Sequence, residues 1–317
     1  MITLDAKAVA DALPYDALIA ALAKAFGSDI EVPQRTHHEV LVPGGTEGTL
    51  LLMPAWQAGR NIGVKIATVF PDNTKQDYPA VFASYLVMSA ASGLPLAVLD
   101  GTELTLRRTA AASALASTYL SRQDAKRLLM VGTGKLAPQL VIAHATARPI
   151  DEVVIWGRRK AASERLAECL SGNAFSVTVS DDLEKSVPEA DIISCATLAK
   201  EPLIKGELLR AGQHLDLVGA FTPDMSEADA DALRLASIYV DTRAGALAEA
   251  GEIVQAMESG TIAASDICGE LAELVSGKAP GRRDASEITL FKSVGTALED
   301  LAAAELALRI FDASLQR

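Results

Sequence analysis

The sequence predicts an α/β protein of two domains, one built on a doubly wound parallel sheet and the other of the α+β kind. Three observations lead to this prediction. The chain has 317 residues, of which 50% are apolar and 22% charged, which is ordinary for a folded protein and enough for two domains. The first third reads as strands joined by short turns, whereas the middle alternates strand-like runs with helical or loop segments. The final segment has a long helical pattern.

The first third is expected to begin with a helix and to continue as a largely antiparallel sheet. Residues 16–26 carry apolar side chains at helical spacing behind Pro14, a residue favoured in a first turn. The segments expected to form strands are 37–42, 49–53, 63–70, 83–89 and 94–100. Because short turns join successive strands, neighbouring strands should pair antiparallel.

The middle of the chain is expected to form a doubly wound parallel sheet. Its strand-like runs are 127–132, 152–156, 175–179, 191–196, 214–220 and 237–241. The helical pattern over 287–315 predicts one long helix that returns to the first domain. The expected domains are therefore 1–111 with 291–317, and 112–290.

Composition excludes several classes of function. The formal net charge is −12 and the calculated pI about 4.9, which opposes nucleic-acid binding because phosphate neutralisation needs a basic surface. Asp5 and Asp11 interrupt the segment where a secretory signal needs an apolar core, and no apolar run is long enough to span a membrane. We therefore expect a cytoplasmic protein without membrane contact. Three widely spaced cysteines fit reduced thiols.

No metal site is expected. His37 and His38 are adjacent in a predicted strand and so face opposite sides. His144 and His214 lie elsewhere, without the spacing of metal ligands.

A glycine-rich turn follows the first strand of the middle region. The turn has the pattern GxGxxA and leads into a helical run at 139–147; its residues are Gly132, Thr133, Gly134, Lys135, Leu136 and Ala137. Gly132 permits a tight turn, Gly134 lets backbone amides approach a pyrophosphate, and Ala137 lets the helix pack closely on the strand. Strand, turn and helix together favour a Rossmann dinucleotide-binding domain over a purely structural turn.

The end of the second strand indicates the type of dinucleotide. NAD-selective sites usually carry an acidic residue there, which binds the ribose hydroxyls. Here Trp156 and Gly157 are followed by Arg158 and Arg159, whose guanidinium groups suit a 2′-phosphate. NADP(H) is therefore favoured, with NAD(H) as the alternative cofactor. The other interpretation of these arginines is a solvated helix start.

Four further segments accompany the glycine-rich turn: Gly-Val-Lys at 63–65, Leu-Arg-Arg-Thr-Ala-Ala at 106–111, Asp-Leu-Val-Gly-Ala-Phe-Thr-Pro-Asp at 216–224, and a late segment at 288–300. In this order, over nearly the whole chain, they resemble the ornithine cyclodeaminase and mu-crystallin family. Among its members the chain is most similar to the ketimine reductases that act on Δ1-pyrroline-2-carboxylate. The resemblance implies a homodimer whose first domain binds substrate and forms the subunit contact.

The resemblance also implies which residues bind substrate and cofactor. The family's binders of the substrate carboxylate correspond to Arg35, Lys65 and Arg108 here. Three cations converging on that carboxylate would hold the substrate with its Cα facing the nicotinamide. Arg107 is the neighbouring alternative, but the Arg-Thr-Ala-Ala pattern of the family selects Arg108. The implied cofactor contacts, besides the glycine-rich turn, Arg158 and Arg159, are Thr109 and Val218.

Two departures from the family pattern bear on the substrate. In ornithine cyclodeaminase an aspartate two residues after the glycine of the Val-Gly segment engages the side-chain amine, and a glutamate before Met-Pro assists proton movement. Phe221 takes the aspartate position here, and residues 49–54 contain no glutamate. An aromatic ring would leave a second ammonium desolvated and unpaired, so an apolar cyclic imine fits better. Asp224 is the acid that a rearranged loop would bring inward.

These residues predict an NAD(P)H-dependent oxidoreductase that reduces a cyclic ketimine carboxylate by hydride transfer to Cα. The expected substrate is Δ1-pyrroline-2-carboxylate, giving L-proline, or Δ1-piperideine-2-carboxylate, giving L-pipecolate. Lys65 is the candidate catalytic residue, because the like charges of Arg35 and Arg108 should lower its pKa and let it influence imine protonation. In the alternative, Lys65 only binds the carboxylate and the imine is protonated by water. The alternative functions are ornithine cyclodeaminase, another amino-acid dehydrogenase, or a non-enzymatic NADPH-binding protein.

Overall fold

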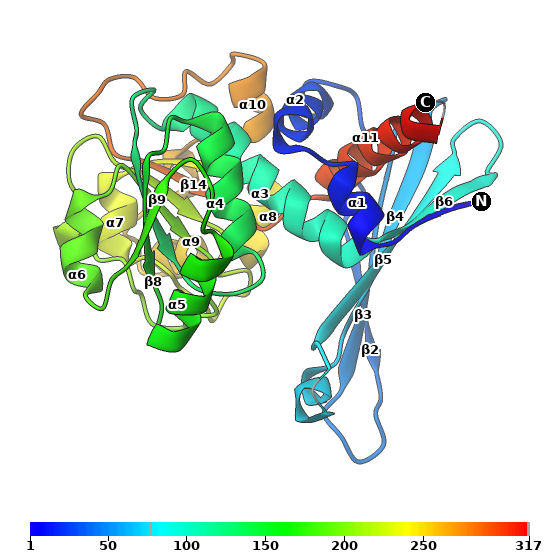
Figure 1. Cartoon of the computed structure of the whole chain (residues 1–317), viewed down its shortest axis with the longest axis horizontal. Coiled ribbons are helices and arrows are strands. Elements are labelled where there is room, and N and C mark those ends of the chain that lie inside the picture. The colour runs from blue at the N-terminus through cyan, green and yellow to red at the C-terminus, as the bar shows by residue number, and fades with distance from the viewer. Residues whose placement is uncertain (77, 316–317) are drawn as a thin grey trace. The chain divides into compact units, whose positions relative to one another are not determined.

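The computed structural model describes residues 1–76 and 78–315, which form two compact units (Figure 1). The first unit comprises residues 1–108 and the segment from Thr296 onward, and the second comprises residues 109–295. The expected boundary at 111/112 lies close to this division. The expected boundary at 290/291 falls inside strand β14 (Thr289–Lys292), which belongs wholly to the second unit.

The first unit contains a six-stranded sheet with the order β1-β6-β5-β4-β3-β2. Neighbouring strands from β2 to β6 pair antiparallel, and only β1 pairs parallel, with β6. The predicted, largely antiparallel sheet is therefore confirmed. The strands are β1 (Ile2–Leu4), β2 (Thr36–Val40), β3 (Gly48–Trp56), β4 (Asn61–Val69), β5 (Val81–Ser89) and β6 (Pro95–Asp100).

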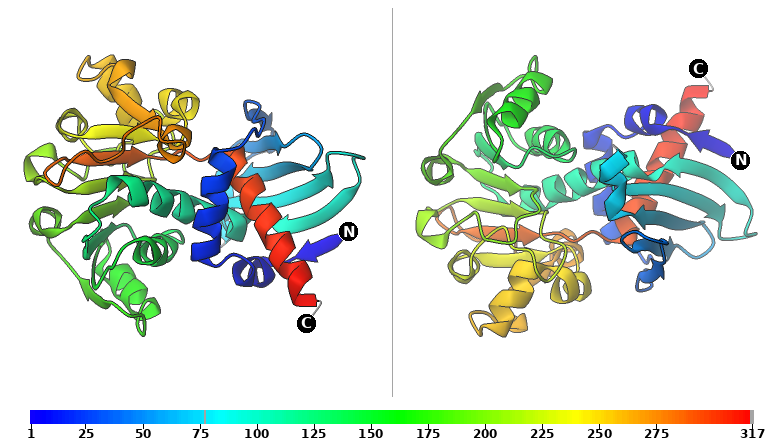
Figure 2. Two further views of the ribbon diagram at one scale, coloured as in Figure 1. Left: turned by 90° about the horizontal axis from the view of Figure 1, so that it is seen from above. Right: turned by 90° about the horizontal axis from the view of Figure 1, so that it is seen from below.

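Helices cover one face of this sheet. Helix α2 and helix α11 lie side by side over it (Figure 2), where Met53 and Ala55 of β3 pack against Ala297 and Leu301 of α11. Since strand side chains alternate between faces, every second residue points away from these helices. The helices of this unit are α1 (Ala6–Asp11), α2 (Tyr15–Phe26), the 3-10 helix η1 (Pro71–Gln76), the start of α3 (Gly101–Leu120) and α11 (Ala297–Leu315).

The second unit contains an eight-stranded sheet in which every pairing is parallel. The strand order, β13-β12-β14-β11-β10-β7-β8-β9, places the first strand, β7, between the two halves of a doubly wound sheet. All six predicted strands are present. The strands are β7 (Arg127–Val131), β8 (Glu152–Trp156), β9 (Ser176–Val179), β10 (Ile192–Cys195), β11 (His214–Leu217), β12 (Ser237–Val240), β13 (Ile267–Glu270) and β14.

Helices lie on both faces of the parallel sheet (Figure 2). They enclose a buried aliphatic core that includes Leu129, Ile193 and Leu215 from three adjacent strands. The helices of this unit are the rest of α3, α4 (Ala137–Ala147), α5 (Lys160–Cys169), α6 (Leu183–Ser186), α7 (Ala230–Leu235), α8 (Arg243–Glu249), α9 (Gly251–Glu258) and α10 (Leu271–Val275), with the 3-10 helices η2 (Val187–Glu189), η3 (Gly206–Leu208) and η4 (Ala264–Asp266).

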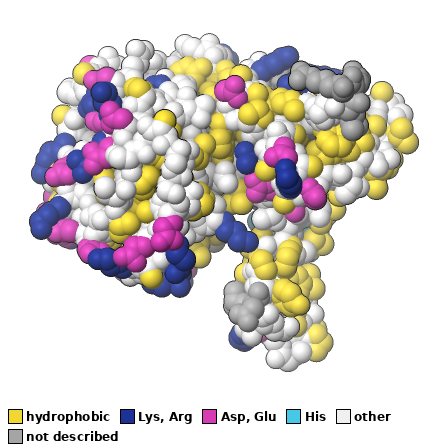
Figure 3. All heavy atoms as spheres, viewed as in Figure 1, with side chains coloured by type: hydrophobic (Ala, Val, Ile, Leu, Met, Phe, Trp, Pro, Cys, Tyr) yellow, Lys and Arg dark blue, Asp and Glu magenta, His cyan; other side chains and the backbone are white. Residues whose placement is uncertain are grey.

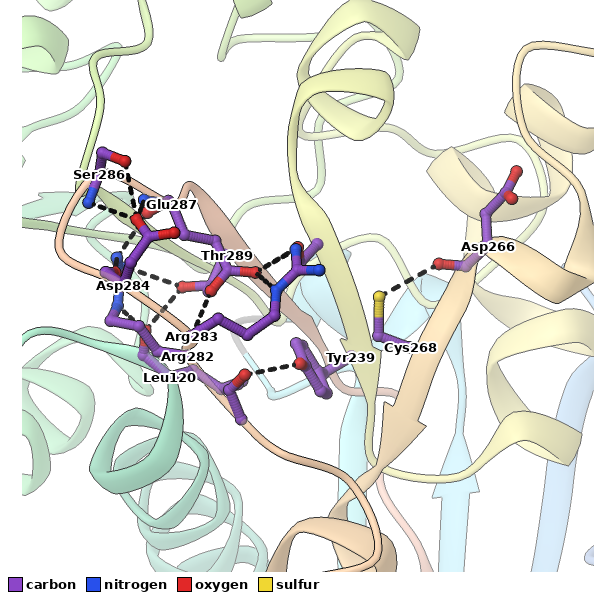
Figure 4. Close-up of polar contacts among 12 residues, drawn as sticks. Leu120, Tyr239, Asp266, Cys268, Arg282, Arg283, Asp284, Ser286, Glu287 and Thr289 are labelled. Carbon is purple, nitrogen blue, oxygen red and sulfur yellow. Dashed lines mark hydrogen bonds and ion pairs between the residues drawn. The ribbon is translucent and has the colours of Figure 1, made fainter.

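The single helix predicted over 287–315 is wrong in its first part. Residues 289–292 form β14, whose four side chains are all buried between β11 and β12. Burial on both faces removes the period-two alternation, so an apolar run of this kind cannot be told from a helix by its pattern. Gly295, with φ of 82°, separates β14 from α11. The turn before β14 is held by Arg282, which donates to the carbonyl of Leu120 (Figure 4).

Candidate functional site

The glycine-rich turn of the second unit has the backbone that the sequence requires. Gly132 follows β7 with φ of 116°, in the left-handed region, and its amide donates to the carbonyl of Trp156 at 2.9 Å. A Cβ on Gly132 would lie 2.5 Å from the carbonyl oxygen of Ala196, so glycine is required on two grounds. A Cβ on Gly134 would meet nothing within 4 Å. The backbone at Gly134 therefore borders open space.

Helix α4 begins directly after this turn. Ala137 is fully buried against the sheet, as its role in close packing predicts. No side chain of the described residues caps the helix at Leu136, and Pro138 in the first turn donates no amide hydrogen. The positive end of the helix dipole makes such a helix start favourable for a phosphate.

A cleft of about 680 Å³ opens at this end of the sheet, where a small molecule or cofactor of ordinary size fits. Exposed Arg158 and Arg159 lie on it directly after β8, and no acidic residue stands at that strand end. The cleft is lined by Gly132, Thr133, Gly134, Trp156, Gly157, Arg158, Arg159, Ala196, Thr197, Leu198, Ala199, Lys200, Glu201 and Leu203.

The other expected cofactor residues lie outside this lining. Lys135 is exposed and Leu136 half-buried at the start of α4. Thr109 and Val218 are each 8% exposed, Thr109 within α3 and Val218 directly after β11. Their part in cofactor binding stays a prediction.

The loop after β11 carries the residue expected to select the substrate. Phe221 is 46% exposed on this loop. The carboxylate of Asp224 lies 2.6 Å from the ammonium of Lys200 and accepts a hydrogen bond from Thr222 Oγ1 at 2.6 Å. These contacts lower the pKa of Asp224 to about 2. Asp224 is thus an ionised carboxylate already paired with a lysine of the neighbouring loop.

In the first unit, two of the expected substrate-binding cations meet in a buried ionic cluster. Asp300 Oδ2 lies 2.8 Å from Lys65 Nζ, and Asp300 Oδ1 accepts from Arg108 Nε at 2.9 Å. Arg108 Nη1 also donates to Glu299 Oε2 at 2.6 Å. All four side chains are nearly or fully buried. Strand β4 supplies Lys65, α3 supplies Arg108, and the first turn of α11 supplies both acids.

The cluster shifts the pKa of Lys65 and that of Asp300. Burial lowers the pKa of Lys65 to about 8, helped by the charges of Arg108 and Arg35 and opposed by Asp300. The pKa of Lys65 is thus lowered, as predicted, but the main cause is desolvation and not the like charge of the arginines. Burial alone would raise the pKa of Asp300, yet the charges of Arg108 and Lys65 outweigh it and hold that pKa below its usual value.

Arg35 and Arg107 are placed differently from each other. Arg35 is half-buried in the segment before β2, where its charge acts on Lys65. Arg107 donates to Glu103 at 2.8 Å and to the carbonyl of Leu13 at 3.1 Å, and lies over the ring of Tyr15. Arg108, not Arg107, therefore joins Lys65.

Sequence reasoning missed Glu299 and Asp300 as members of this cluster. The signal available in the sequence is a pair of adjacent acids in the first turn of a helix whose following residues are mostly apolar. Carboxylates are rarely buried without a partner, so such a pair indicates cations nearby.

The described residues contain no group of three or more histidine, cysteine or acidic side chains arranged to hold a metal ion. Buried His144 and His214 contact Asp216 and Thr289, each at 3.0 Å. Among the described helices none is both long and apolar enough to cross a membrane. On the face of the second unit seen in Figure 3, side chains of both charges are interspersed.

Comparison with known proteins places these features in a family. A model of the ornithine cyclodeaminase/mu-crystallin family matches residues 2–312. A Δ1-pyrroline-2-carboxylate reductase of Colwellia psychrerythraea is 40% identical over 306 residues, covering 95% of this chain and 96% of that protein.

Two solved structures have the same fold over nearly the whole chain. The Δ1-pyrroline-2-carboxylate reductase of Thermococcus litoralis, in complex with NADH and L-proline, has a TM-score of 0.91 at 33% identity and covers 98% of this chain and 97% of that one. An archaeal alanine dehydrogenase dimer with bound NAD has a TM-score of 0.91 at 28% identity and covers 99% and 97%. The fold is therefore shared by enzymes with different substrates.

Proposed function

Because the chain belongs to the ornithine cyclodeaminase/mu-crystallin family, whose members are NAD(P)-dependent enzymes, we propose that it reduces a cyclic ketimine carboxylate. The proposed reaction is Δ1-pyrroline-2-carboxylate to L-proline, with Δ1-piperideine-2-carboxylate to L-pipecolate as a second substrate. The observation that carries the proposal is the buried cluster of Lys65, Arg108 and Asp300. The relative from Thermococcus litoralis, solved with NADH and L-proline, supports a small cyclic imino acid as substrate.

The charges of the first unit suit a single substrate carboxylate. Lys65 and Arg108 are buried beside Asp300 and Glu299, and the charge of Arg35 also acts on Lys65. An ammonium has three donors, so Lys65 can pair with Asp300 and still donate to a substrate carboxylate. These cations would attract a substrate carboxylate, whereas they would repel a second ammonium on the substrate.

Lys65 supplies the proton that the reaction needs. When bound, a dinucleotide would supply the hydride for the new C–H bond at Cα. The imine nitrogen gains one proton, and the C=N bond becomes CH–NH. An acid with a pKa of about 8 is mostly protonated at neutral pH and gives up its proton readily, as a general acid must. Asp300 holds the ammonium in place and keeps it charged.

NADP(H) is the proposed cofactor, with NAD(H) as the alternative. Arg158 and Arg159 lie exposed on the cleft, where a 2′-phosphate would need cations. The absence of an acid at the end of β8 removes the usual repulsion of that phosphate. The solved relatives bind NADH and NAD, so both dinucleotides belong in the test.

Phe221 favours an apolar imine over ornithine. A half-exposed aromatic ring offers no charge to a second ammonium. Asp224, the nearby acid, is paired with Lys200 and Thr222. Turning it toward substrate would break both contacts and leave Lys200 without this partner.

The open face of the six-stranded sheet supports a homodimer. Pro54, Val64, Leu86 and Val98 lie opposite one another across four strands and are all partly exposed. On the same face Ile66 is 39% and Phe82 47% exposed. A second copy of this chain would cover such an apolar surface, and the archaeal alanine dehydrogenase is a dimer.

The test is oxidation of NADPH and NADH by the purified protein with Δ1-pyrroline-2-carboxylate, beside ammonia release from L-ornithine with NAD⁺. We expect reduction without ammonia release, and we expect Phe221→Asp to lose that reduction. Ammonia release from ornithine without imine reduction would contradict the proposal. So would a requirement for ammonia with an open-chain oxo acid, which would indicate an amino-acid dehydrogenase. Dinucleotide binding without turnover would indicate a binding protein.

A further inference from the structure

A fully buried carboxylate joins the two loops that follow β10 and β11. Glu227 Oε1 accepts from the amide of Thr197 at 2.7 Å and from its hydroxyl at 2.8 Å. Glu227 Oε2 accepts from the amide of Gly219 at 2.7 Å. The Glu227 side chain thus accepts hydrogen bonds from three donors on two loops. The residue is fully buried.

One of these loops lines the cleft that the second unit offers a dinucleotide, and the other carries Val218, a predicted cofactor contact. Thr197 lines the cleft together with Ala196 and residues 198–201. Gly219 follows Val218, and the same loop continues to Phe221. The two loops approach each other closely at Gly219, because a Cβ there would lie 2.1 Å from the carbonyl oxygen of Thr197. A small shift of either loop would therefore displace the other.

The surroundings of Glu227 contain further buried charge. Lys292 of β14 and Glu252 of α9 form a fully buried ion pair at 2.9 Å. Burial raises the pKa of Glu227 and Glu252 raises it further, while Lys292 and the donors of Thr197 lower it. Cys195 at the end of β10 is also buried there, and burial together with Glu227 raises the pKa of its thiol. Lys292 thus offsets part of the effect of burial on Glu227.

We propose that Glu227 is a positioning residue of the dinucleotide site, which holds the Thr197 and Gly219 loops in the arrangement that the cofactor binds. This inference rests on the proposed function in one respect, which is that the cofactor is a nicotinamide dinucleotide. Glu227 itself touches neither cofactor nor substrate. Its carboxylate acts through Thr197, which lines the cleft, and through the loop that carries Phe221.

The experiment compares Glu227→Gln with Asp216→Asn. Glutamine has nearly the size of glutamate, but its amide nitrogen cannot accept a hydrogen bond, so Thr197 or Gly219 loses its acceptor. Asp216 is an equally buried carboxylate of β11 that bonds His144 and Ser194 and does not line the cleft. Each variant is titrated with NADPH and NADH, without imine, at a temperature well below its melting temperature. Quenching of tryptophan fluorescence reports binding, because Trp156 lines the cleft.

We expect Glu227→Gln to raise the Kd of the dinucleotide about 10-fold or more, since a buried amide without an acceptor is costly. Asp216→Asn should lower the melting temperature and leave the Kd within about 2-fold of wild type. Amide hydrogen exchange should accelerate over residues 196–203 and 217–222 in Glu227→Gln alone. If Glu227→Gln does not fold, Gly219→Ala is used, since its Cβ would force the same loops apart.

Unchanged binding and unchanged exchange in Glu227→Gln would overturn the inference. Equal weakening by Glu227→Gln and Asp216→Asn would also overturn it, because the effect would then be general destabilisation. A wild-type protein that binds reduced dinucleotide but reduces no ketimine refutes the proposed function and leaves this comparison intact.

Discussion

Lys65 Nζ lies 2.8 Å from Asp300 Oδ2, although β4 and α11 come from opposite ends of the sequence. The same carboxylate holds Arg108 at 2.9 Å. One acid thereby fixes two of the cations that the sequence assigns to the substrate. Because both contacts are buried, each partner governs the charge of the others.

The pH dependence of the reaction should report the ionisation of Lys65. Its pKa of about 8 means that the ammonium is present below pH 8 and is lost as the pH rises through that value. We therefore expect kcat/KM to fall above about pH 8. Lys65→Met should lower kcat/KM about 100-fold or more at neutral pH and abolish this limb of the profile.

Lys65→Arg is the matched control for this prediction. A guanidinium stays charged throughout the range, so the variant should bind the carboxylate without a limb near pH 8. Steady-state rates from pH 6 to about 10 measure both variants. A limb that persists in Lys65→Met would mean that another group titrates and that Lys65 donates no proton.

Asp300→Asn should move the alkaline limb to lower pH. The carboxylate raises the pKa of Lys65, so its removal lets burial and Arg108 lower that pKa further. Removing one partner of a buried ion pair should also lower the free energy of unfolding by about 3–5 kcal/mol, which chemical denaturation measures. Asp312→Asn, an exposed acid of the same helix, should leave the limb and the stability unchanged. A limb at wild-type pH in Asp300→Asn would contradict the assignment of that limb to Lys65.

Arg158 and Arg159 should decide the preference between the two dinucleotides. Replacing both with alanine removes charged hydrogen bonds to a 2′-phosphate, so the KM for NADPH should rise about 10-fold to 100-fold while that for NADH changes little. Lys160→Ala is the control, because the neighbouring ammonium already pairs with Asp181 at 2.8 Å. Equal KM changes for both dinucleotides would indicate that the arginines do not contact the phosphate.

The open face of the six-stranded sheet should hold the dimer together. Ile66→Glu places a charge in this apolar face, and the desolvation of that charge opposes association. We expect light scattering to show a monomer, whereas Leu94→Glu, in the exposed turn between β5 and β6, should stay dimeric. A dimer that persists in Ile66→Glu would place the subunit contact elsewhere.

Much of the fold could be predicted from local patterns. The alternation of strand and helical segments gave the six parallel strands from β7 to β12, and turn residues gave the antiparallel strands from β2 to β6. Gly132 could be assigned because a backbone angle that only glycine tolerates leaves a direct mark on the sequence. Strand β14 was missed because burial on both faces leaves no alternation to detect.

The sequence by itself determined the family, the two kinds of sheet, the glycine-rich turn and the identity of the candidate cations, since these depend on residue type and local spacing. Only the tertiary structure decided that Asp300 joins Lys65 to Arg108 and that Glu227 joins Thr197 to Gly219. Such contacts depend on segments distant in the chain meeting in a dry interior. In that interior, burial and the neighbouring charges set the ionisation of each group. The spacing of residues along the sequence does not reveal these contacts.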